Sequence, residues 1–297
     1  GTSGNVAPWG GQTYGYASGG TWSPDPANEQ TVVEKFSFAS DGNAIDHGDL
    51  WNARFFCAGN SASAYGYVTG GEEGSAAGDI IQKFAFAGSN VTGTDVGNLT
   101  VAVRSNGGSS SSTYGYCLGG YAGPTYNVIN KFAFATDGDA SDVGDMTSTR
   151  LAIAGTESET DGYVLGGNST SNIIDKFSFS SDGNATDRGD LAIGSEAPGS
   201  ASSGTHGYCT GGYQSSAPYN EIQKFAFANS TNATDIADLT ADHYYPYSWY
   251  SGTYGYNAGT RSPYTNVCDK FPFASDTNAT DVGDLSTTKA AGAGQQY

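Results

Sequence analysis

The phrase Lys-Phe-x-Phe occurs six times in this chain, and it limits the possible folds more than any other feature. Its copies begin at Lys35, Lys83, Lys131, Lys176, Lys224 and Lys270, with spacings of 48, 48, 45, 48 and 46 residues. A phrase ending in Gly-Tyr precedes each copy, and an acidic phrase such as residues 185–191 follows it. A period of about 50 residues with strand-like content indicates a closed or stacked repeat architecture.

The repeat predicts a single domain over residues 1–297, made of six units of about 47 residues. One unit of this size cannot bury its apolar face alone, so the units have to pack on one another. The 20 Tyr and 14 Phe predict an aromatic core of packed sheets. The 44 Gly, with many Ser, Asn and Thr, fit tight turns. No apolar run reaches the length of a membrane span, and no signal peptide is visible.

The formal charge of −18 argues against two classes of partner. Nucleic acid requires a basic surface, so we expect no nucleic-acid binding. Anionic membrane surfaces are disfavoured for the same reason, and we expect no membrane partner.

The fourth unit shows the strand pattern most clearly. Residues 163–167 form a short apolar stretch that ends in paired glycines, and residues 172–179 alternate so that Phe177 and Phe179 share one face. Residues 181–184 predict a hairpin turn and 185–191 a third strand. A fourth strand, expected at 151–154, precedes the glycine-tyrosine phrase. Four short antiparallel strands make one propeller blade, and six blades close a ring.

The two ends of the chain are complementary. The sequence enters directly in the strand of Tyr14 and Tyr16, so the first unit lacks its innermost strand, and residues 286–297 form an innermost-type strand with no unit after it. We therefore expect the C-terminal strand to complete the first blade and remove the exposed sheet edge. A stacked solenoid would need polar capping units at its ends, and none is seen.

The repeat resembles the kelch repeat. The carriers of this resemblance are Gly-Tyr-Val-Leu-Gly-Gly at 162–167, Ile-Ile-Asp-Lys-Phe at 173–177, and the step to an arginine at 146–150. It extends over about residues 14–297 and implies a β-propeller. The usual outer-strand Trp is missing, and Asp-rich phrases stand in its place. The amino-acid sequence of the repeat is also similar to that of repeat proteins encoded by marine bacteriophages, often among fibre or virion-surface genes.

Six of the seven lysines share one position of the repeat, which favours a structural role. We expect Lys35, Lys83, Lys131, Lys176, Lys224 and Lys270 to form ion pairs with outer-strand aspartates. The candidate partners are Asp46, Asp142, Asp187, Asp235 and Asp281, or the series Asp49, Asp190 and Asp284.

The turn phrase Asp41-Gly-Asn43-x-x-Asp46 has the ligand types of a calcium loop without its spacing. Backbone capping is the default interpretation, and calcium stays an alternative.

Signatures of catalysis and of cofactor binding are missing. Cys57, Cys117, Cys209 and Cys268 show no metal-ligand spacing, so we expect free thiols that act as small buried hydrophobes. The three histidines fall at different repeat positions, and no motif of a hydrolase, metalloprotease or phosphate-binding loop occurs. The sequence predicts no enzyme, no metal and no cofactor.

A ligand site is expected where the repeats differ. The loops between second and third strands and the inter-blade connections emerge on one face of a propeller. The ligand-binding candidates on that face are Trp22, Trp51, Tyr121, Tyr126, Tyr213, Tyr219, His243, Arg261 and Tyr264. Exposed aromatic rings could stack on sugars, or the tyrosines could simply wall neighbouring loops. The aromatic run 244–250 either plugs the channel or marks a contact surface.

These features predict a non-enzymatic binding module on a virion surface, or otherwise extracellular, as part of a phage fibre or appendage that contacts host surface glycan. The alternative is a structural propeller that packs against other virion proteins or, as a homo-oligomer, against copies of itself in a fibre or shell. A hydrolase of surface polysaccharide is a more distant third possibility.

Overall fold

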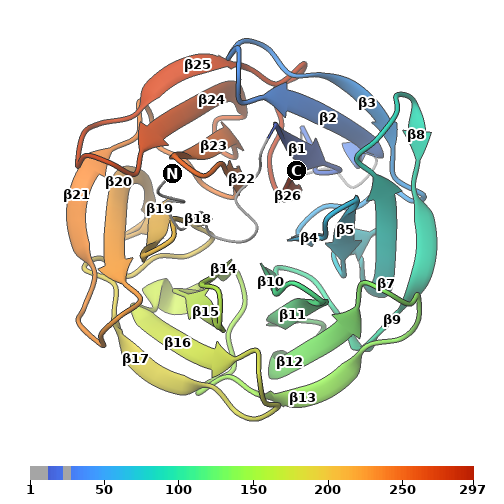
Figure 1. Ribbon diagram of the computed structural model, residues 1–297, viewed down its shortest axis with the longest axis horizontal. Helices are drawn as coiled ribbons and strands as arrows, with labels where there is room; N and C mark the ends of the chain where they lie inside the picture. The colour runs from blue at the N-terminus through green and yellow to red at the C-terminus, as the bar shows by residue number, and fades with distance from the viewer. Residues whose placement is uncertain (1–12, 23–27) are drawn as a thin grey trace, which may run out of the picture.

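Six antiparallel sheets are arranged around a central axis in the computed structural model, which describes residues 13–22 and 28–297 (Figure 1). Within each sheet the strands run outward from the axis in chain order, except that the first sheet begins with the C-terminal strand. The predicted six-bladed β-propeller of four-stranded blades is thus confirmed. In the described part of the chain no helix is long and apolar enough to cross a membrane.

Each blade has four main strands, named in order from the axis outward. Blades 1 to 3 consist of β26 (Ala293–Gln296), β1 (Tyr14–Ser18), β2 (Val32–Ser37) and β3 (Ile45–Asp49); β4 (Ala58–Ser61), β5 (Tyr65–Thr69), β7 (Ala76–Ala85) and β9 (Thr94–Val103); β10 (Gly107–Ser110), β11 (Tyr114–Tyr121), β12 (Thr125–Ala133) and β13 (Ser141–Asp145). Blades 4 to 6 consist of β14 (Ala154–Glu157), β15 (Asp161–Leu165), β16 (Ile173–Ser178) and β17 (Thr186–Asp190); β18 (Gly199–Ser202), β19 (His206–Gln214), β20 (Ala217–Ala226) and β21 (Thr234–Asp238); β22 (Tyr247–Tyr250), β23 (Tyr254–Thr260), β24 (Thr265–Pro272) and β25 (Thr280–Asp284).

Three short elements lie outside this scheme. Strand β6 (Glu72–Glu73) pairs with β7, and β8 (Val91–Thr92) adds to the outer edge of blade 1 in a parallel register with β3. A 3-10 turn, η2 (Asn168–Thr170), joins the second and third strands of blade 4.

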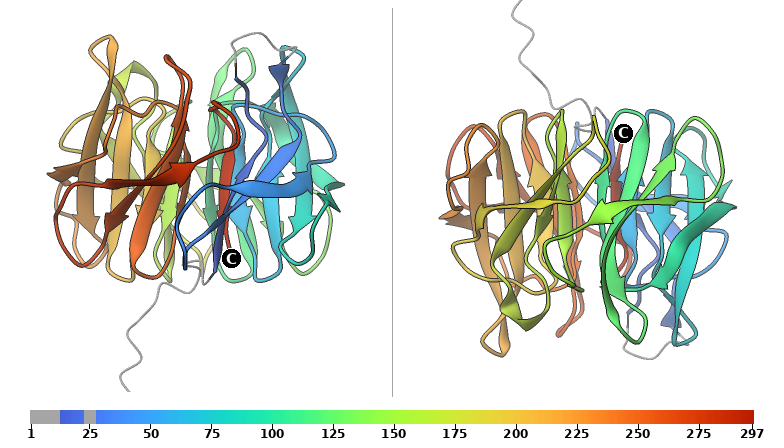
Figure 2. Two further views of the ribbon diagram at one scale, coloured as in Figure 1. Left: turned by 90° about the horizontal axis from the view of Figure 1, so that it is seen from above. Right: turned by 90° about the horizontal axis from the view of Figure 1, so that it is seen from below.

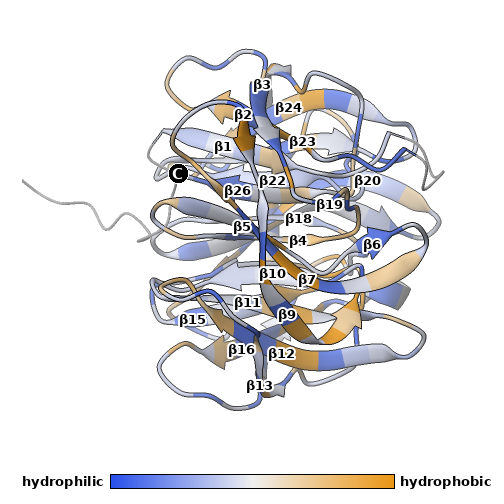
Figure 3. Cartoon of the chain, turned by 90° about the vertical axis from the view of Figure 1, so that its right-hand side faces the viewer, coloured by the Kyte–Doolittle hydropathy of each residue, from blue (hydrophilic) through white to orange (hydrophobic). Residues whose placement is uncertain are grey.

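A tyrosine from the second strand of each blade packs against two phenylalanines of the next blade. The Tyr67 ring centroid is 5.4 Å from that of Phe132 and 5.0 Å from that of Phe134. The corresponding stacked distances in the other five blades are 4.7–5.1 Å. Each of the six tyrosines is at most 2 % exposed. Hydrophobic stretches accordingly lie along the strands, among them β7 and β24 (Figure 3).

In five blades the glycine before this tyrosine makes room for a phenylalanine of its own blade, whereas Gly15 of blade 1 lies against Trp249. Gly115 is paired with Phe132 across the strands, and a Cβ on Gly115 would lie 2.3 Å from the Phe132 ring. A Cβ on Gly162 would lie 2.2 Å from the ring of Phe177. Any larger residue would push the ring out of its place between the blades. The repeated Gly-Tyr and Phe-x-Phe phrases are therefore two halves of one packing unit.

The blades present two different faces, seen edge-on in Figure 2. Connections between first and second strands and between third and fourth strands lie on one face, which we call the turn face. Connections between second and third strands and between blades lie on the other, which we call the mouth face. This division follows from the antiparallel order of the strands in every blade.

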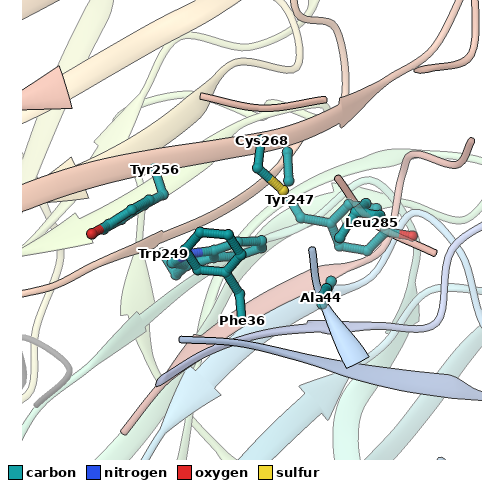
Figure 4. Packing of buried hydrophobic residues seen from close by; sticks show 9 residues of the cluster. Phe36, Ala44, Tyr247, Trp249, Tyr256, Cys268 and Leu285 are labelled. Atoms are coloured by element: carbon teal, nitrogen blue, oxygen red, sulfur yellow. The ribbon is translucent and has the colours of Figure 1, made fainter. Parts of the chain in front are cut away.

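The C-terminal strand closes the ring as the sequence predicts. Strand β26 pairs with β1 in an antiparallel register from Gly15–Gln296 to Ser18–Ala293. Beside it, Trp249 and Tyr256 of blade 6 pack on Phe36 of blade 1 (Figure 4), with ring centroids 6.0 and 5.6 Å from that of Phe36. Lys289 pairs with buried Glu34 of blade 1 at 2.5 Å.

The predicted position of the innermost strand is wrong by about three residues. In blade 4 the sequence predicts a strand at 151–154, whereas β14 spans Ala154–Glu157. The reason is Ala152, whose φ of 54° lies in the left-handed region and interrupts an extended strand. Its N–H group donates to the carbonyl of Ser105 in the preceding inter-blade connection.

Deletion of residues 286–297 tests the closure. The truncation removes β26 and the Lys289–Glu34 pair, and it leaves β1 as an unpaired edge, so we expect the cooperative thermal transition to be lost. Circular dichroism during heating measures this. Tyr297→Ala is the control, because it keeps β26 and changes a side chain that is 46 % exposed. Equal melting of the truncated and full-length chains would show that β26 does not close the ring.

Candidate functional site

Six backbone groups form a closed hydrogen-bonded ring at the mouth face. The N–H groups of one residue per inter-blade connection each donate to the carbonyl of the preceding member, with N···O distances of 2.5–3.0 Å, and Phe56 closes the circle by donating to Ala291. All six have φ between 49° and 62°. We call this set the mouth ring: Phe56, Ser105, Ala152, Ala197, Tyr245 and Ala291. Left-handed backbone at non-glycine residues costs about 1–3 kcal/mol each and is often found at functional sites.

Two further positions in every blade surround the mouth ring. One follows the glycine-pair position: Thr21, Glu72, Tyr121, Asn168, Tyr213 and Arg261. The other precedes the ring residue: Ala290, Phe55, Arg104, Leu151, Glu196 and Tyr244. Backbone contacts join the two positions in each blade, for example between Tyr121 and Arg104. The packing positions repeat in most blades, whereas these positions vary widely in chemistry, so the repeats diverge most around the mouth.

Seven of these residues line a basin of about 420 Å³ on the axis at the mouth face. The lining residues are Phe56, Arg104, Ser105, Tyr121, Leu151, Tyr245 and Arg261. Every one of them occupies one of the three mouth positions. The volume lies within the usual range of small-ligand sites, roughly 300–1,000 Å³.

An aromatic pair with an arginine above it forms one side of the basin. The rings of Phe56 and Tyr245 are 4.7 Å apart. They flank Ala291 in the mouth ring, whose small side chain leaves space for their contact. The Arg261 guanidinium lies over both rings, 5.2 Å from Phe56 and 5.9 Å from Tyr245. Burial raises the pKa of Tyr245 to about 12, so its phenol is neutral near pH 7.

A second arginine lies over an aromatic ring in the same basin. The guanidinium of Arg104 is 5.4 Å from the Tyr121 ring and forms an ion pair with Glu72. Glu72 is 6 % exposed, so its carboxylate compensates the Arg104 charge from beneath the surface. Arg104 is thereby held in place and contributes little net charge to the basin.

Below the mouth ring, two smaller cavities of about 70 and 120 Å³ continue along the axis. The larger is lined mainly by the small and polar side chains of the innermost strands. Toward the turn face, the Tyr250 hydroxyl donates to the carboxylate of Glu157 from another blade. Burial raises the Glu157 pKa to about 7, while hydrogen bonds, first that of Tyr250, act in the opposite direction.

The structure places four of the predicted ligand-binding residues at or near the basin. Tyr121 and Arg261 line it. Trp22, which follows the mouth position Thr21, is 43 % exposed, and Tyr213 stacks on Tyr244 with centroids 4.9 Å apart. Trp51 is 51 % exposed and directly follows β3, at the outer rim of the mouth face.

The remaining four candidates are held within the fold. Tyr126 packs on the core between blades 2 and 3, and the Tyr219 hydroxyl accepts a hydrogen bond from Gln223 at 3.4 Å. Tyr264 is half-buried, and its hydroxyl is enclosed. His243 is 1 % exposed, and its ring nitrogens contact the Gly259 carbonyl at 2.8 Å and Asp269 at 3.1 Å. We therefore leave these four out of the candidate site.

Five residues of the basin are not among the candidates predicted from the sequence: Phe56, Arg104, Ser105, Leu151 and Tyr245. They belong to inter-blade connections whose sequence in part predicts strand. An alignment of the six units at the mouth-ring position would have shown that Phe56 and Tyr245 replace the alanines of three other blades.

The aromatic residues of the run 244–250 lie in several parts of the structure rather than in one. Tyr244 and Tyr245 lie at the mouth, before β22 rather than after it. Tyr247 is buried and donates to the Gly19 carbonyl at 2.7 Å, and Trp249 packs between blades 6 and 1. Tyr250 contributes to the narrow end of the channel through its bond to Glu157.

The repeated lysines form ion pairs, but with partners other than the expected ones. Four of them reach the first aspartate of the hairpin turn in the next blade: Lys83–Asp137, Lys131–Asp182, Lys224–Asp276 and Lys270–Asp41. Lys176 pairs with Asp161 of its own blade at 3.2 Å, because the turn of blade 5 carries Ser230 at this position.

The predicted ion pair of Lys35 is not formed among the described residues. The turn of blade 2 carries Ser89 in place of the aspartate, and the Lys35 ammonium lies 4.6 Å from the Tyr14 ring centroid. The outer-strand aspartates proposed as partners instead serve their own strands. Four of them accept a hydrogen bond from the N–H of the glycine two residues on, as Asp142 does from Gly144 at 3.1 Å; these four are Asp46, Asp142, Asp187 and Asp281.

The acidic turns cap backbone groups of the preceding blade. The Asn184 side-chain oxygen accepts from the Asp145 N–H at 3.1 Å, and Asn43 does the same for Asp284 at 3.2 Å. Among residues 13–22 and 28–297, no group of three or more His, Cys, Asp or Glu side chains is placed to hold a metal ion. All four cysteines are free and buried, as predicted.

No model of a known protein family matches this chain, and no curated protein is significantly similar to it. The six-bladed propeller therefore stands on the structure itself. This architecture is compatible with a binding module or with a structural module, and the fold alone does not choose between them.

The buried Glu157 predicts a pH dependence of stability. Its folded-state pKa, about 7, is above the ordinary value of 4.5, so its contribution to stability is full below pH 4.5 and is lost as the pH rises to 7. Glu157→Gln should abolish this loss, which amounts to up to about 3 kcal/mol. Urea unfolding between pH 4.5 and 8 measures it. Glu159→Gln, two residues away and exposed, is the control and should behave as wild type. An unchanged pH profile in Glu157→Gln would contradict the assignment.

The lysine pairs should contribute modestly to stability. Asp182 is 59 % exposed and Lys131 18 %, so Lys131→Met should lower the free energy of unfolding by at most about 1 kcal/mol. Lys35→Met is the matched control, since this lysine has the same position without a carboxylate partner. Denaturant titration compares the two variants. A loss above about 2 kcal/mol would mean a stronger pair than this exposure permits.

Proposed function

We propose that this protein is a non-enzymatic binding module whose ligand site is the mouth basin, and that its ligand is a glycan of a host surface. The observation that carries the proposal is that all seven lining residues belong to the three positions at which the blades differ. The scaffold positions repeat because they pack. The mouth positions differ from blade to blade, and seven of their side chains converge on one basin.

The chemistry of the basin suits a sugar. Phe56, Tyr121 and Tyr245 offer aromatic faces on which the apolar face of a sugar ring can stack, and Arg104, Arg261 and Ser105 offer hydrogen-bond donors for its oxygens. None of the seven lining residues is a histidine or a carboxylate, the groups that most often carry proton transfer in catalysis. Binding without turnover is the function that this composition favours.

The proposed location is a virion surface or another extracellular position, within a phage fibre or appendage. It is supported by the similarity of the repeat wording to phage virion-surface proteins and by the acidic composition of the chain. The proposed partners are host surface glycan at the mouth face and other virion proteins elsewhere. The resemblance of the repeat to the kelch repeat is consistent with the propeller, and it rests on the amino-acid sequence alone.

A glycan array compared across mouth variants tests the proposal. Tyr245→Ala and Phe56→Ala should fold, because Ala152, Ala197 and Ala291 occupy the same position in other blades. Loss of a stacking face should weaken binding of the array hits about threefold to tenfold per variant. Trp51→Ala, which changes an exposed aromatic at the rim, is the control and should bind as wild type.

Three results would contradict the proposal. The wild-type protein could bind no glycan and instead form ordered assemblies, which would favour a structural propeller. Glycan binding could persist unchanged in both mouth variants, which would move the site elsewhere. Release of reducing sugar from host polysaccharide by the protein would make it an enzyme.

A further inference from the structure

Arg261 is one of three cationic side chains that form no ion pair with a carboxylate of the described residues. The chain has 12 Lys and Arg against 30 Asp and Glu, and nine of the twelve form ion pairs within the described residues. The three others are Lys35, Arg188 and Arg261. In so acidic a chain, an accessible arginine without an acidic partner requires a specific explanation.

The other two unpaired cations are accounted for by the fold. Arg188 is 4 % exposed and donates to backbone carbonyls, among them that of Thr231 at 2.8 Å. Lys35 lies over Tyr14 toward the opposite face, at the one lysine position where neither the next turn nor its own blade supplies an aspartate. Arg261, by contrast, lines the mouth basin of about 420 Å³.

The donors of Arg261 are available to a ligand. Its backbone N–H donates to the Tyr244 carbonyl at 2.9 Å, while its guanidinium makes no hydrogen bond to any described residue and lies over Phe56 and Tyr245. The guanidinium is thus beside two aromatic rings, and no described residue accepts a hydrogen bond from it. The planar edge of a guanidinium binds a carboxylate through two parallel hydrogen bonds. The nearby Arg104 cannot take this role equally, since Glu72 already neutralises it.

We propose that the mouth basin selects saccharides that carry a carboxylate, such as uronic or sialic acids, and that Arg261 binds this carboxylate while the sugar ring stacks on the aromatic faces beside it. This inference rests on the proposed function and narrows its ligand class. The site places an arginine that forms no ion pair with a described carboxylate next to three aromatic rings, whereas the chain as a whole carries a charge of −18. A neutral sugar would leave the Arg261 donors without an acceptor of opposite charge.

Binding of matched acidic and neutral sugars tests the proposal. The probes are tri-galacturonate and 3′-sialyllactose, each beside its methyl ester, in which a neutral ester replaces every carboxylate. Calorimetry or fluorescence titration gives the ratio of dissociation constants. At least one acid should bind wild-type protein roughly tenfold or more tightly than its ester, because a hydrogen bond to a charged group contributes about 1.5–3 kcal/mol.

The decisive variant is Arg261→Asn, since Asn168 occupies the same position in blade 4. It should bind acid and ester with nearly equal affinity, at the level of the ester on wild type. Arg261→Lys keeps the charge without the planar edge and should show an intermediate ratio. Lys35→Gln is the control, because it removes an unpaired cation near the other face, and it should keep the wild-type ratio. Melting temperatures establish that each variant is folded.

The outcomes separate this inference from the proposed function. Equal binding of acids and esters by wild type, or an unchanged ratio in Arg261→Asn, overturns the carboxylate assignment and leaves glycan binding intact. Failure of all four probes together with a blank glycan array overturns both. Binding of an acidic peptide that depends on Arg261, with no saccharide bound, also overturns both and assigns the basin to a protein partner.

Discussion

The structure depends on one contact made six times, the packing of a tyrosine against two phenylalanines of the next blade. This contact explains why the repeat exists in the form it does. In five blades the glycine before the tyrosine admits the phenylalanine of the same blade, and the phenylalanines are two residues apart because only alternate residues of a strand share a face. A blade that lost any of these residues would fail to hold both of its neighbours.

Because the interior is held by identical contacts, the mouth face is under little constraint from packing. The lysines, turn aspartates and capping asparagines tie consecutive blades together at the turn face, as with Lys131–Asp182 and the Asn184 cap. The backbone ring through Phe56, Ser105, Ala152, Ala197, Tyr245 and Ala291 ties them at the mouth. Both ties use the same atoms in most blades. Side chains at the mouth positions can therefore vary without disturbing either one.

The fold was predictable from the sequence because its determinants recur with the period of the repeat. Phe177 and Phe179, the paired glycines and the complementary chain ends each imply a local arrangement, and six copies imply closure. The innermost strand was misplaced because residues 151–154 look extended by composition, whereas Ala152 has a left-handed backbone as a member of the hydrogen-bonded mouth ring. Local strand propensity does not predict this backbone conformation, because the hydrogen bonds that hold it come from other inter-blade connections.

The candidate site was predicted only in part, for a related reason. The face and two of its residues, Tyr121 and Arg261, followed from the rule that variable loops share one end of a propeller. Phe56 and Tyr245 are far apart in sequence and meet because the ring closes. His243 looked available, and its partner Asp269 could be identified only when the two strands were seen side by side.

The closed backbone ring has a consequence for how such a protein could diversify. It holds eighteen outward positions, three per blade, on a frame whose geometry is set by main-chain atoms alone. An exchange at one of the positions that line the basin, such as Phe56 or Tyr245, alters the chemistry of the mouth while the main-chain frame keeps its hydrogen bonds. The arrangement resembles the paratope of an antibody in this respect. A fixed scaffold carries a surface of variable side chains, and a few amino-acid substitutions there are enough to change its binding specificity.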